Sequence, residues 1–140
     1  MLIDANILLY AVISDYPQHS DAKAWFEDQL NGPKRVGLSW PTLLAFLRIS
    51  THPRIFSDPL AISEAWEYVT QWLDLSNVWI PQAGDRHAEV LGELLILSGS
   101  SANLVPDAHL AALAIEHGLT VYSCDSDFAR FKSVTWINPI

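Results

Sequence analysis

Short apolar runs alternate with helical segments along the whole chain of 140 residues, and this alternation restricts the fold more than any other feature. Five runs have the length and apolar character of short strands: Met1–Asp4, Val36–Leu38, Val78–Ile80, Thr120–Ser123 and Val134–Ile137, the last at an edge. Helical patterns separate most of them, and strands joined through helices pair in parallel by crossover connections. The pattern therefore predicts a three-layer α/β/α fold with a central, mostly parallel sheet of four or five short strands.

The segment Leu104–Ala114 is expected to form a helix that lies close against this sheet. Pro106 falls in the first turn, where the missing N–H costs no hydrogen bond, and Gly118 ends the helix. Asp107 shares a face with the apolar residues three, four and seven positions later. Because an unpaired buried charge is costly, Asp107 either caps the helix or belongs to a cluster of acids that has a function.

Five further helices are expected from their periodicity and from the proline, glycine or capping residues at their ends. They cover Ile7–Ile13, His19–Leu30, Pro41–Ser50, Pro59–Leu73 and Asp85–Ser98. Ser39 has the position of an N-cap, and Pro41 follows in the first turn. In the helix that Pro59 opens, the inward candidates are Ala61, Ala65, Tyr68, Val69 and Trp72.

Composition restricts the setting of the protein. Half of the residues are hydrophobic, which is enough to build a core in a single domain over residues 1–140. Cys124 is the single cysteine, which excludes an internal disulfide and fits a reducing compartment. Asp4 and Asn6 interrupt the first apolar run, so no signal peptide is expected, and no apolar run is long enough to span a membrane. We therefore expect a cytoplasmic protein.

The formal net charge of −8 argues against broad electrostatic binding to nucleic acid, which needs clustered lysines and arginines. A local cationic rim is compatible with it, and Arg48, Arg54 and Arg130 are the candidates for contacts with phosphate groups. A net acidic chain also suits a basic partner, or divalent cations held by carboxylates.

Acids follow two of the expected strands. Asp4 ends the first strand, and Asp125 and Asp127 follow the Thr120–Ser123 strand. In parallel sheets, ligand sites lie at the carboxyl ends of the strands, and the helix that carries Asp107 begins at this same edge. We therefore expect Asp4, Asp107 and Asp125 to converge. Carboxylates held together repel one another, and oxygen-only ligands favour Mg²⁺ or Mn²⁺, which would activate water and stabilise charge on a phosphoryl group.

Four segments resemble, in this order, those of PIN domains, and among them the VapC-type toxins of bacterial toxin–antitoxin pairs. They are Leu2–Asn6, Phe46–Ile49, Asp107–Ala112 and Ser123–Phe128, and the ordered set extends over nearly the whole chain. The resemblance implies an endoribonuclease that depends on Mg²⁺ or Mn²⁺ and hydrolyses RNA phosphodiester bonds. It also implies a cognate VapB-type antitoxin as inhibitor and a homodimer as the oligomeric state.

The resemblance also assigns roles to individual residues. Asp4, Asp107 and Asp125 match the acids that hold the metal and catalyse the reaction. Three further positions match residues that support the site or lie at its margin: Asn6, Ser123 and Asp127.

The sequence departs from this family pattern at Ala45. The family usually has a glutamate immediately before the Phe-Leu-Arg segment, and this chain has Ala45 there. Three acids are enough to hold one metal ion, whereas a second metal ion and the full catalytic rate remain open. The alternative function is therefore a PIN-fold protein that binds RNA or an antitoxin without cutting, or that cuts weakly.

A third hypothesis is a phosphatase of the haloacid-dehalogenase kind, because Asp125 and Asp127 form an Asp-x-Asp motif after a strand. That motif normally follows the first strand of the core and needs a downstream lysine, whereas here it lies near the end of the chain with only Lys132 after it. His109, two residues from Asp107, projects to another side of its helix and is expected to be structural or exposed. No base-reading motif identifies the RNA.

Overall fold

The computed structural model describes residues 1–99 and 101–140. Its centre is a five-stranded sheet in the order β3-β2-β1-β4-β5, and every strand pair is parallel. The strands are β1 (Leu2–Ile3), β2 (Val36–Gly37), β3 (Val78–Trp79), β4 (Val121–Tyr122) and β5 (Trp136–Ile137). The predicted parallel sheet is therefore confirmed, with five strands that are each shorter than the apolar runs suggested.

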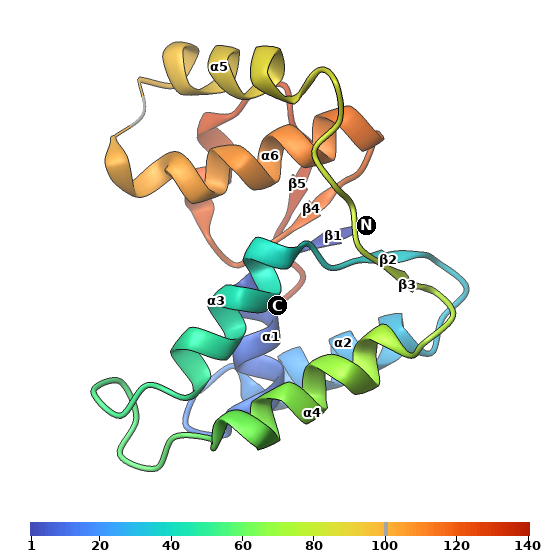
Figure 1. Cartoon of the computed structure of the whole chain (residues 1–140), viewed down its shortest axis with the longest axis vertical. Coiled ribbons are helices and arrows are strands. Elements are labelled where there is room, and N and C mark those ends of the chain that lie inside the picture. The colour runs from blue at the N-terminus through green and yellow to red at the C-terminus, as the bar shows by residue number, and fades with distance from the viewer. Residues whose placement is uncertain (100) are drawn as a thin grey trace.

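Helices cover both faces of the sheet, which confirms the three-layer α/β/α prediction (Figure 1). They are α1 (Ala5–Val12), α2 (His19–Leu30), α3 (Trp40–Ser50), α4 (Ile62–Leu73), α5 (His87–Leu97) and α6 (Val105–His117), with short 3₁₀ turns η1 (Ala102–Leu104) and η2 (Ser126–Arg130). Helices α5 and α6 lie on one side of the sheet in Figure 1, and α1, α2, α3 and α4 lie on the other.

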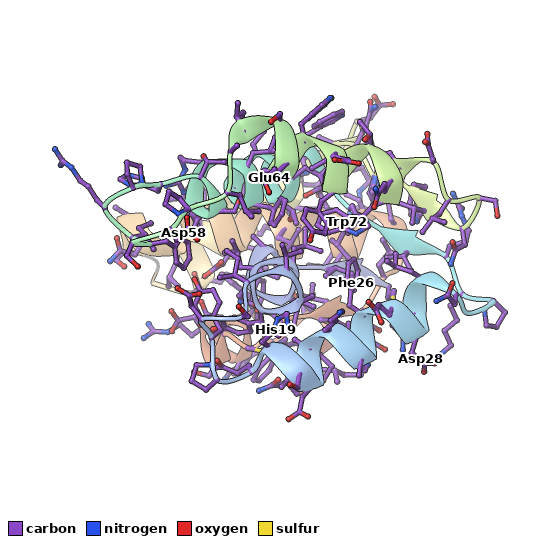
Figure 2. The ribbon with its side chains drawn as sticks, turned by 90° about the horizontal axis from the view of Figure 1, so that it is seen from below. His19, Phe26, Asp28, Asp58, Glu64 and Trp72 are labelled. Atoms are coloured by element: carbon purple, nitrogen blue, oxygen red, sulfur yellow. The ribbon has the colours of Figure 1, made fainter. Side chains whose placement is uncertain are left out.

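The two faces of the sheet have separate hydrophobic cores because successive side chains of a strand point to opposite faces. In β1, Leu2 packs with α5, α6 and η2, whereas Ile3 packs with α1 to α4, and both are fully buried. On the larger side, Phe26 of α2 and Trp72 of α4 meet edge to face at 5.5 Å (Figure 2). Interlocking aromatic rings of this kind hold the helices in one arrangement.

The expected helix Pro59–Leu73 begins later than the sequence suggested. Its observed start is Ile62, because Ala61 is the N-cap and the Glu64 carboxylate accepts a hydrogen bond from the Ala61 N–H at 3.1 Å. Two of its five inward candidates, Ala61 and Tyr68, are exposed, and Ala65, Val69 and Trp72 are buried as predicted. A proline favours a first turn, but here the hydrogen bond from the Ala61 N–H to Glu64 marks the boundary.

The ends of the helices near the sheet follow their sequence signals. Ser39 caps α3 by accepting a hydrogen bond from the Thr42 N–H at 3.4 Å, and Pro106 lies in the first turn of α6. Gly118 ends α6 in the left-handed conformation, with φ of 64°. In residues 1–99 and 101–140, no helix has both the length and the apolar character needed to cross a membrane.

Candidate active site

The sheet reverses its strand order between β1 and β4. From β1 the chain proceeds outward to β2 and β3, and it then returns to place β4 and β5 on the other side of β1. Two neighbouring strands whose connections leave in opposite directions open a crevice at their carboxyl ends. Asp4 follows β1 directly and Ser123 follows β4 directly, so both side chains stand at this crevice.

Asp4 is held by hydrogen bonds to both of its carboxylate oxygens. Its Oδ1 accepts from the Ala5 N–H at 2.7 Å, and its Oδ2 accepts from Asn6 Nδ2 at 3.0 Å and from Ser123 Oγ at 2.7 Å. Asn6 Nδ2 also donates to Ser123 Oγ at 2.9 Å, and Asn6 Oδ1 accepts from the Cys124 N–H at 3.1 Å. Asn6 and Ser123 therefore tie the ends of β1 and β4 together around Asp4, and their supporting role in the reaction stays a prediction.

The closest group of acids is Asp107, Asp125 and Asp127. One carboxylate oxygen from each lies within 4.8 Å of the other two. Asp125 caps η2 by accepting from the Asp127 N–H at 2.9 Å, and its own N–H donates to Ser123 Oγ at 3.0 Å. Asp4 stands beside this group, since Asp125 contributes to its electrostatic environment. The structure thus brings the predicted acids to one edge and draws Asp127 from the margin into the group.

The surroundings of the acids favour their protonated forms in the metal-free protein. Burial raises the pKa of Asp107 to about 7, and the neighbouring charges of Asp4, Asp125 and Asp127 add to this shift. Burial also raises the pKa of Asp4, although the hydrogen bonds from Ser123 and Ala5 act in the opposite direction. Both shifts mean that negative charge is concentrated beyond what the site stabilises by itself.

This donor set fits a hard divalent cation. The three close carboxylates offer only oxygen ligands, and a cation between them would remove the repulsion that raises the pKa of Asp107. Mg²⁺ and Mn²⁺ both accept such ligands and retain water molecules. The residues present therefore fit the metal that the sequence led us to expect.

Of the three arginines expected at a cationic rim, Arg130 contacts one of the acids. Arg130 belongs to η2, and its Nε lies 3.5 Å from Asp127 Oδ1. Arg48 is exposed in the last turn of α3, the end away from the Ser39 cap at the sheet, and Arg54 is exposed in the loop that follows. The structure therefore connects Arg130 with the acids, and the rim roles of Arg48 and Arg54 stay predictions.

Trp136 makes a contact to the site that sequence analysis missed. Its indole Nε1 donates to the carbonyl oxygen of Ser123 at 2.9 Å, and the Ser123 N–H donates to the carbonyl of Ile137 at 3.1 Å. β5 therefore holds the backbone of the residue whose hydroxyl bonds Asp4 and Asp125. No local signal in the sequence reveals this bond, because it depends on the pairing of β5 with β4.

A second polar cluster lies between α5 and α6. Glu116 Oε2 lies 2.6 Å from His87 Nδ1, and His87 Nε2 lies 3.0 Å from His109 Nδ1. Glu116 Oε1 also accepts from the Gly84 N–H at 3.1 Å. His109 therefore faces α5, in agreement with the prediction that it projects away from Asp107, and the cluster ties the start of α5 to α6.

Ala45 occupies a half-buried position on α3, one turn after Thr42. The Thr42 hydroxyl lies 3.4 Å from the carbonyl oxygen of Ile3, the residue before Asp4. The side of α3 that carries Thr42 thus approaches the end of β1. Within the described residues, the group of close acids consists of Asp107, Asp125 and Asp127, and α3 contributes no member to it.

Comparison with known proteins connects this geometry with a family. Residues 1–134 match the family model described as PIN domain. Ribonuclease VapC33 of Mycobacterium tuberculosis is 44% identical over 137 residues, which cover 98% of this chain and 96% of the relative. Ribonuclease VapC37 of the same species is 43% identical over 138 residues, which cover 99% and 96%.

Solved structures with low sequence identity share the fold. VapBC-1 from nontypeable Haemophilus influenzae has a TM-score of 0.68 at 16% identity and covers 99% of this chain and 96% of that chain. VapBC2 from Rickettsia felis, bound to a DNA fragment from their promoter, has a TM-score of 0.67 at 16% identity and covers 98% and 96%.

Proposed function

The chain belongs to the PIN-domain family and, within it, to the VapC ribonucleases, and we propose that it is a metal-dependent endoribonuclease. The single observation that carries the proposal is the group of acids at the switch point of the sheet, where Asp107, Asp125 and Asp127 lie within 4.8 Å of one another. The proposed reaction is hydrolysis of an RNA phosphodiester bond. The proposed biological role is that of the toxin in a pair with a VapB-type antitoxin.

In this proposal, Asp107, Asp125 and Asp127 hold Mg²⁺ or Mn²⁺, and Asp4 completes the negative edge beside them. A bound divalent cation at such a site supplies an activated water and stabilises charge on the phosphoryl group. Asn6 and Ser123 keep Asp4 in one orientation through hydrogen bonds of 3.0 and 2.7 Å to its Oδ2. Because its orientation is fixed in advance, Asp4 adds its charge to the metal site without first losing side-chain freedom, so Asn6 and Ser123 preorganise this edge of the sheet.

Calorimetric titration with Mn²⁺ tests the metal site. We expect Asp107→Asn and Asp125→Asn each to weaken Mn²⁺ binding by about tenfold or more, as for loss of a charged ligand from a partly buried site. The same measurement on Asp127→Asn and Asp4→Asn gives the contributions of the third acid of the group and of the acid beside it. Asp28→Asn is the control, because Asp28 is an exposed acid of α2 (Figure 2). Equal Mn²⁺ affinity in Asp107→Asn and in the control would disprove the assignment.

RNA cleavage separates the proposed enzyme from a binding protein of the same fold. We expect the purified chain to cut single-stranded RNA with Mg²⁺ or Mn²⁺ and to be inactive in EDTA. The product of the neighbouring reading frame should inhibit cleavage when it is added in stoichiometric amount. Binding of Mn²⁺ and RNA without any cleavage would instead support the weak or inactive PIN-fold protein, for which Ala45 is the motivating residue.

A further inference from the structure

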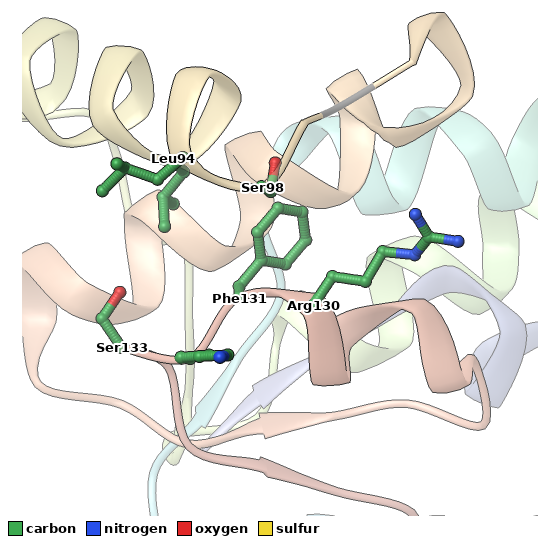
Figure 3. Close-up of a pocket in the computed structure, with 7 residues that line it drawn as sticks. Leu94, Ser98, Arg130, Phe131 and Ser133 are labelled. Atoms are coloured by element: carbon green, nitrogen blue, oxygen red, sulfur yellow. The ribbon is translucent and has the colours of Figure 1, made fainter.

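A cavity lies between the C-terminal half of α5 and the segment after η2. Its volume is about 270 Å³. In Figure 3, the ring of Phe131 points toward the end of α5 near Ser98, and the side chain of Arg130 extends away from Leu94 and Ser133. Leu94, Phe131 and Arg130 all line the cavity. Lys132 and Ser133 belong to the same wall. The lining thus combines apolar side chains, of which Leu97 is exposed and Leu94 and Phe131 are buried, with two cationic residues and two serines.

The charge of this cavity differs from that of the chain as a whole. The protein has 16 acidic residues and only 8 lysines and arginines, yet two of these cationic residues, Arg130 and Lys132, line the cavity. Among the described residues that line it, none is an acid. An anion with an apolar body therefore matches the cavity, since the cations attract its charge and the exposed Leu97 accepts its apolar face.

Arg130 connects this cavity with the proposed active site. Its Nε lies 3.5 Å from Asp127 Oδ1, and Asp127 belongs to the group of three close acids. An RNA strand that places one phosphate at these acids therefore passes Arg130 when it continues toward α5. A nucleotide has the parts that the cavity accepts, namely an anionic phosphate, ribose hydroxyls and a base with an apolar face.

We propose that the cavity between α5 and residues 130–133 binds the nucleotide adjacent to the phosphate that is cleaved, an inference that rests on the proposed ribonuclease function. Lys132 contacts its phosphate, Arg130 extends from the cavity toward the acids, and the base lies against Leu97, the exposed apolar side chain of the lining. The strongly acidic site repels RNA, and this cationic cavity next to it supplies the attraction that the substrate needs.

Two neighbouring residues of α5 provide a matched test. Leu97 lines the cavity, whereas Ile96 does not, and their exposed fractions are 83% and 81%. Leu97→Asp and Ile96→Asp change the net charge equally, and neither buries a carboxylate in the core. The experiment measures kcat and KM for a labelled single-stranded RNA with Mn²⁺, together with Mn²⁺ affinity and the melting temperature.

We expect Leu97→Asp to raise KM by about tenfold through repulsion of the phosphate, and Ile96→Asp to change it less than about twofold. Mn²⁺ affinity and melting temperature should agree between the two variants. Lys132→Gln is a second variant, with Lys23→Gln on α2 as its control, and it should also raise KM. Equal KM values within both pairs would overturn the proposal.

Inhibition by the antitoxin distinguishes a nucleotide site from a site for a protein segment. If Leu97→Asp leaves KM unchanged but weakens this inhibition, the cavity binds an acidic segment of the protein partner, and the proposal is wrong. If the wild-type protein does not cleave RNA, the proposed function fails, and fluorescence anisotropy with the same RNA tests the cavity alone. Loss of RNA affinity in Leu97→Asp but not in Ile96→Asp would then support the nucleotide site, and equal affinities of the two variants would disprove it.

Discussion

At the scale of residues, Asp107 and Asp4 are two acids of the site whose pKa is raised. The carboxyl of Asp107 lies at the start of α6, and its pKa is raised to about 7 by burial and by three neighbouring acids. Asp4 also has a raised pKa, but hydrogen bonds from Ser123 and Ala5 stabilise its charged form. The two acids therefore differ in what stabilises their ionised forms. Hydrogen-bond donors stabilise the ionised form of Asp4, whereas a bound cation would stabilise that of Asp107.

This difference predicts how stability depends on pH without metal. In the unfolded chain Asp107 ionises near its ordinary value of 3.8, whereas the folded protein keeps the proton up to about 7. The folded state binds more protons in this window, so the free energy of unfolding should fall as pH rises from about 4 to 7 and then level off. Thermal melts in EDTA should show a shallower fall for Asp107→Asn.

A steeper fall in Asp107→Asn than in the wild-type protein would contradict this account of the acid. Saturating Mn²⁺ supplies a second check, because the cation favours the ionised carboxylates. The stabilisation by Mn²⁺ should therefore grow as pH rises through the same window, and Asp28→Asn should behave as the wild-type protein does.

At the scale of elements, helix ends carry the site. α1 begins at the Asp4 cap, Asp107 lies in the first turn of α6, and η2 begins at the Asp125 cap. Positive potential at a helix N-terminus stabilises a nearby carboxylate, so these three starts place acids where the backbone partly compensates their charge. The helices thus position the acids and reduce the cost of bringing them together.

Two glycines of the helical layer give a matched prediction for stability. Gly118 has φ of 64° at the end of α6, and a methyl group there would meet no atom within 4 Å, so strain alone acts in Gly118→Ala. We expect it to lower the free energy of unfolding by about 1 kcal/mol. Gly92 lies inside α5 with equally open space, and Gly92→Ala should raise it by about 0.5 to 1 kcal/mol.

Urea unfolding of both variants measures these changes. If Gly118→Ala and Gly92→Ala shift the midpoint in the same direction, the left-handed conformation of Gly118 is not what ends α6.

At the scale of the whole molecule, apolar surface remains uncovered on α3 and α4. Leu44 of α3 is 57% exposed, and Ile62 and Trp66 of α4 are 64% and 46% exposed. Large exposed apolar side chains on neighbouring elements are typical of a protein interface. The homodimer predicted from the sequence would bury this surface.

Light scattering at micromolar concentration should accordingly give a mass of twice 15.6 kDa. Leu44→Lys should shift the mass toward that of the single chain, because a charge would enter the centre of the proposed interface. Ile137→Lys on β5 is the control, since Ile137 is 43% exposed on a different part of the molecule. A single-chain mass for the wild-type protein would rule out the dimer.

The sequence by itself determined the features that depend on local pattern. Apolar runs, helical periodicity and caps such as Ser39 and Gly118 predicted the layers, and they placed Asp4 at the end of β1 and Asp107 at the start of α6. Local pattern predicted boundaries less well. The predicted start of α4 at Pro59 was wrong, because the observed start at Ile62 depends on the hydrogen bond from the Ala61 N–H to Glu64.

Only the tertiary structure decided which side chains meet. It placed Asp127 in the close group of acids, tied Arg130 to that group, and brought Trp136 to the carbonyl of Ser123. These contacts depend on strand order, on the register of β5 against β4 and on the directions of individual side chains, none of which a periodic pattern encodes. Periodicity indicates which face of a helix or strand is buried. It carries no information on the distance in space between two elements that lie far apart in the sequence.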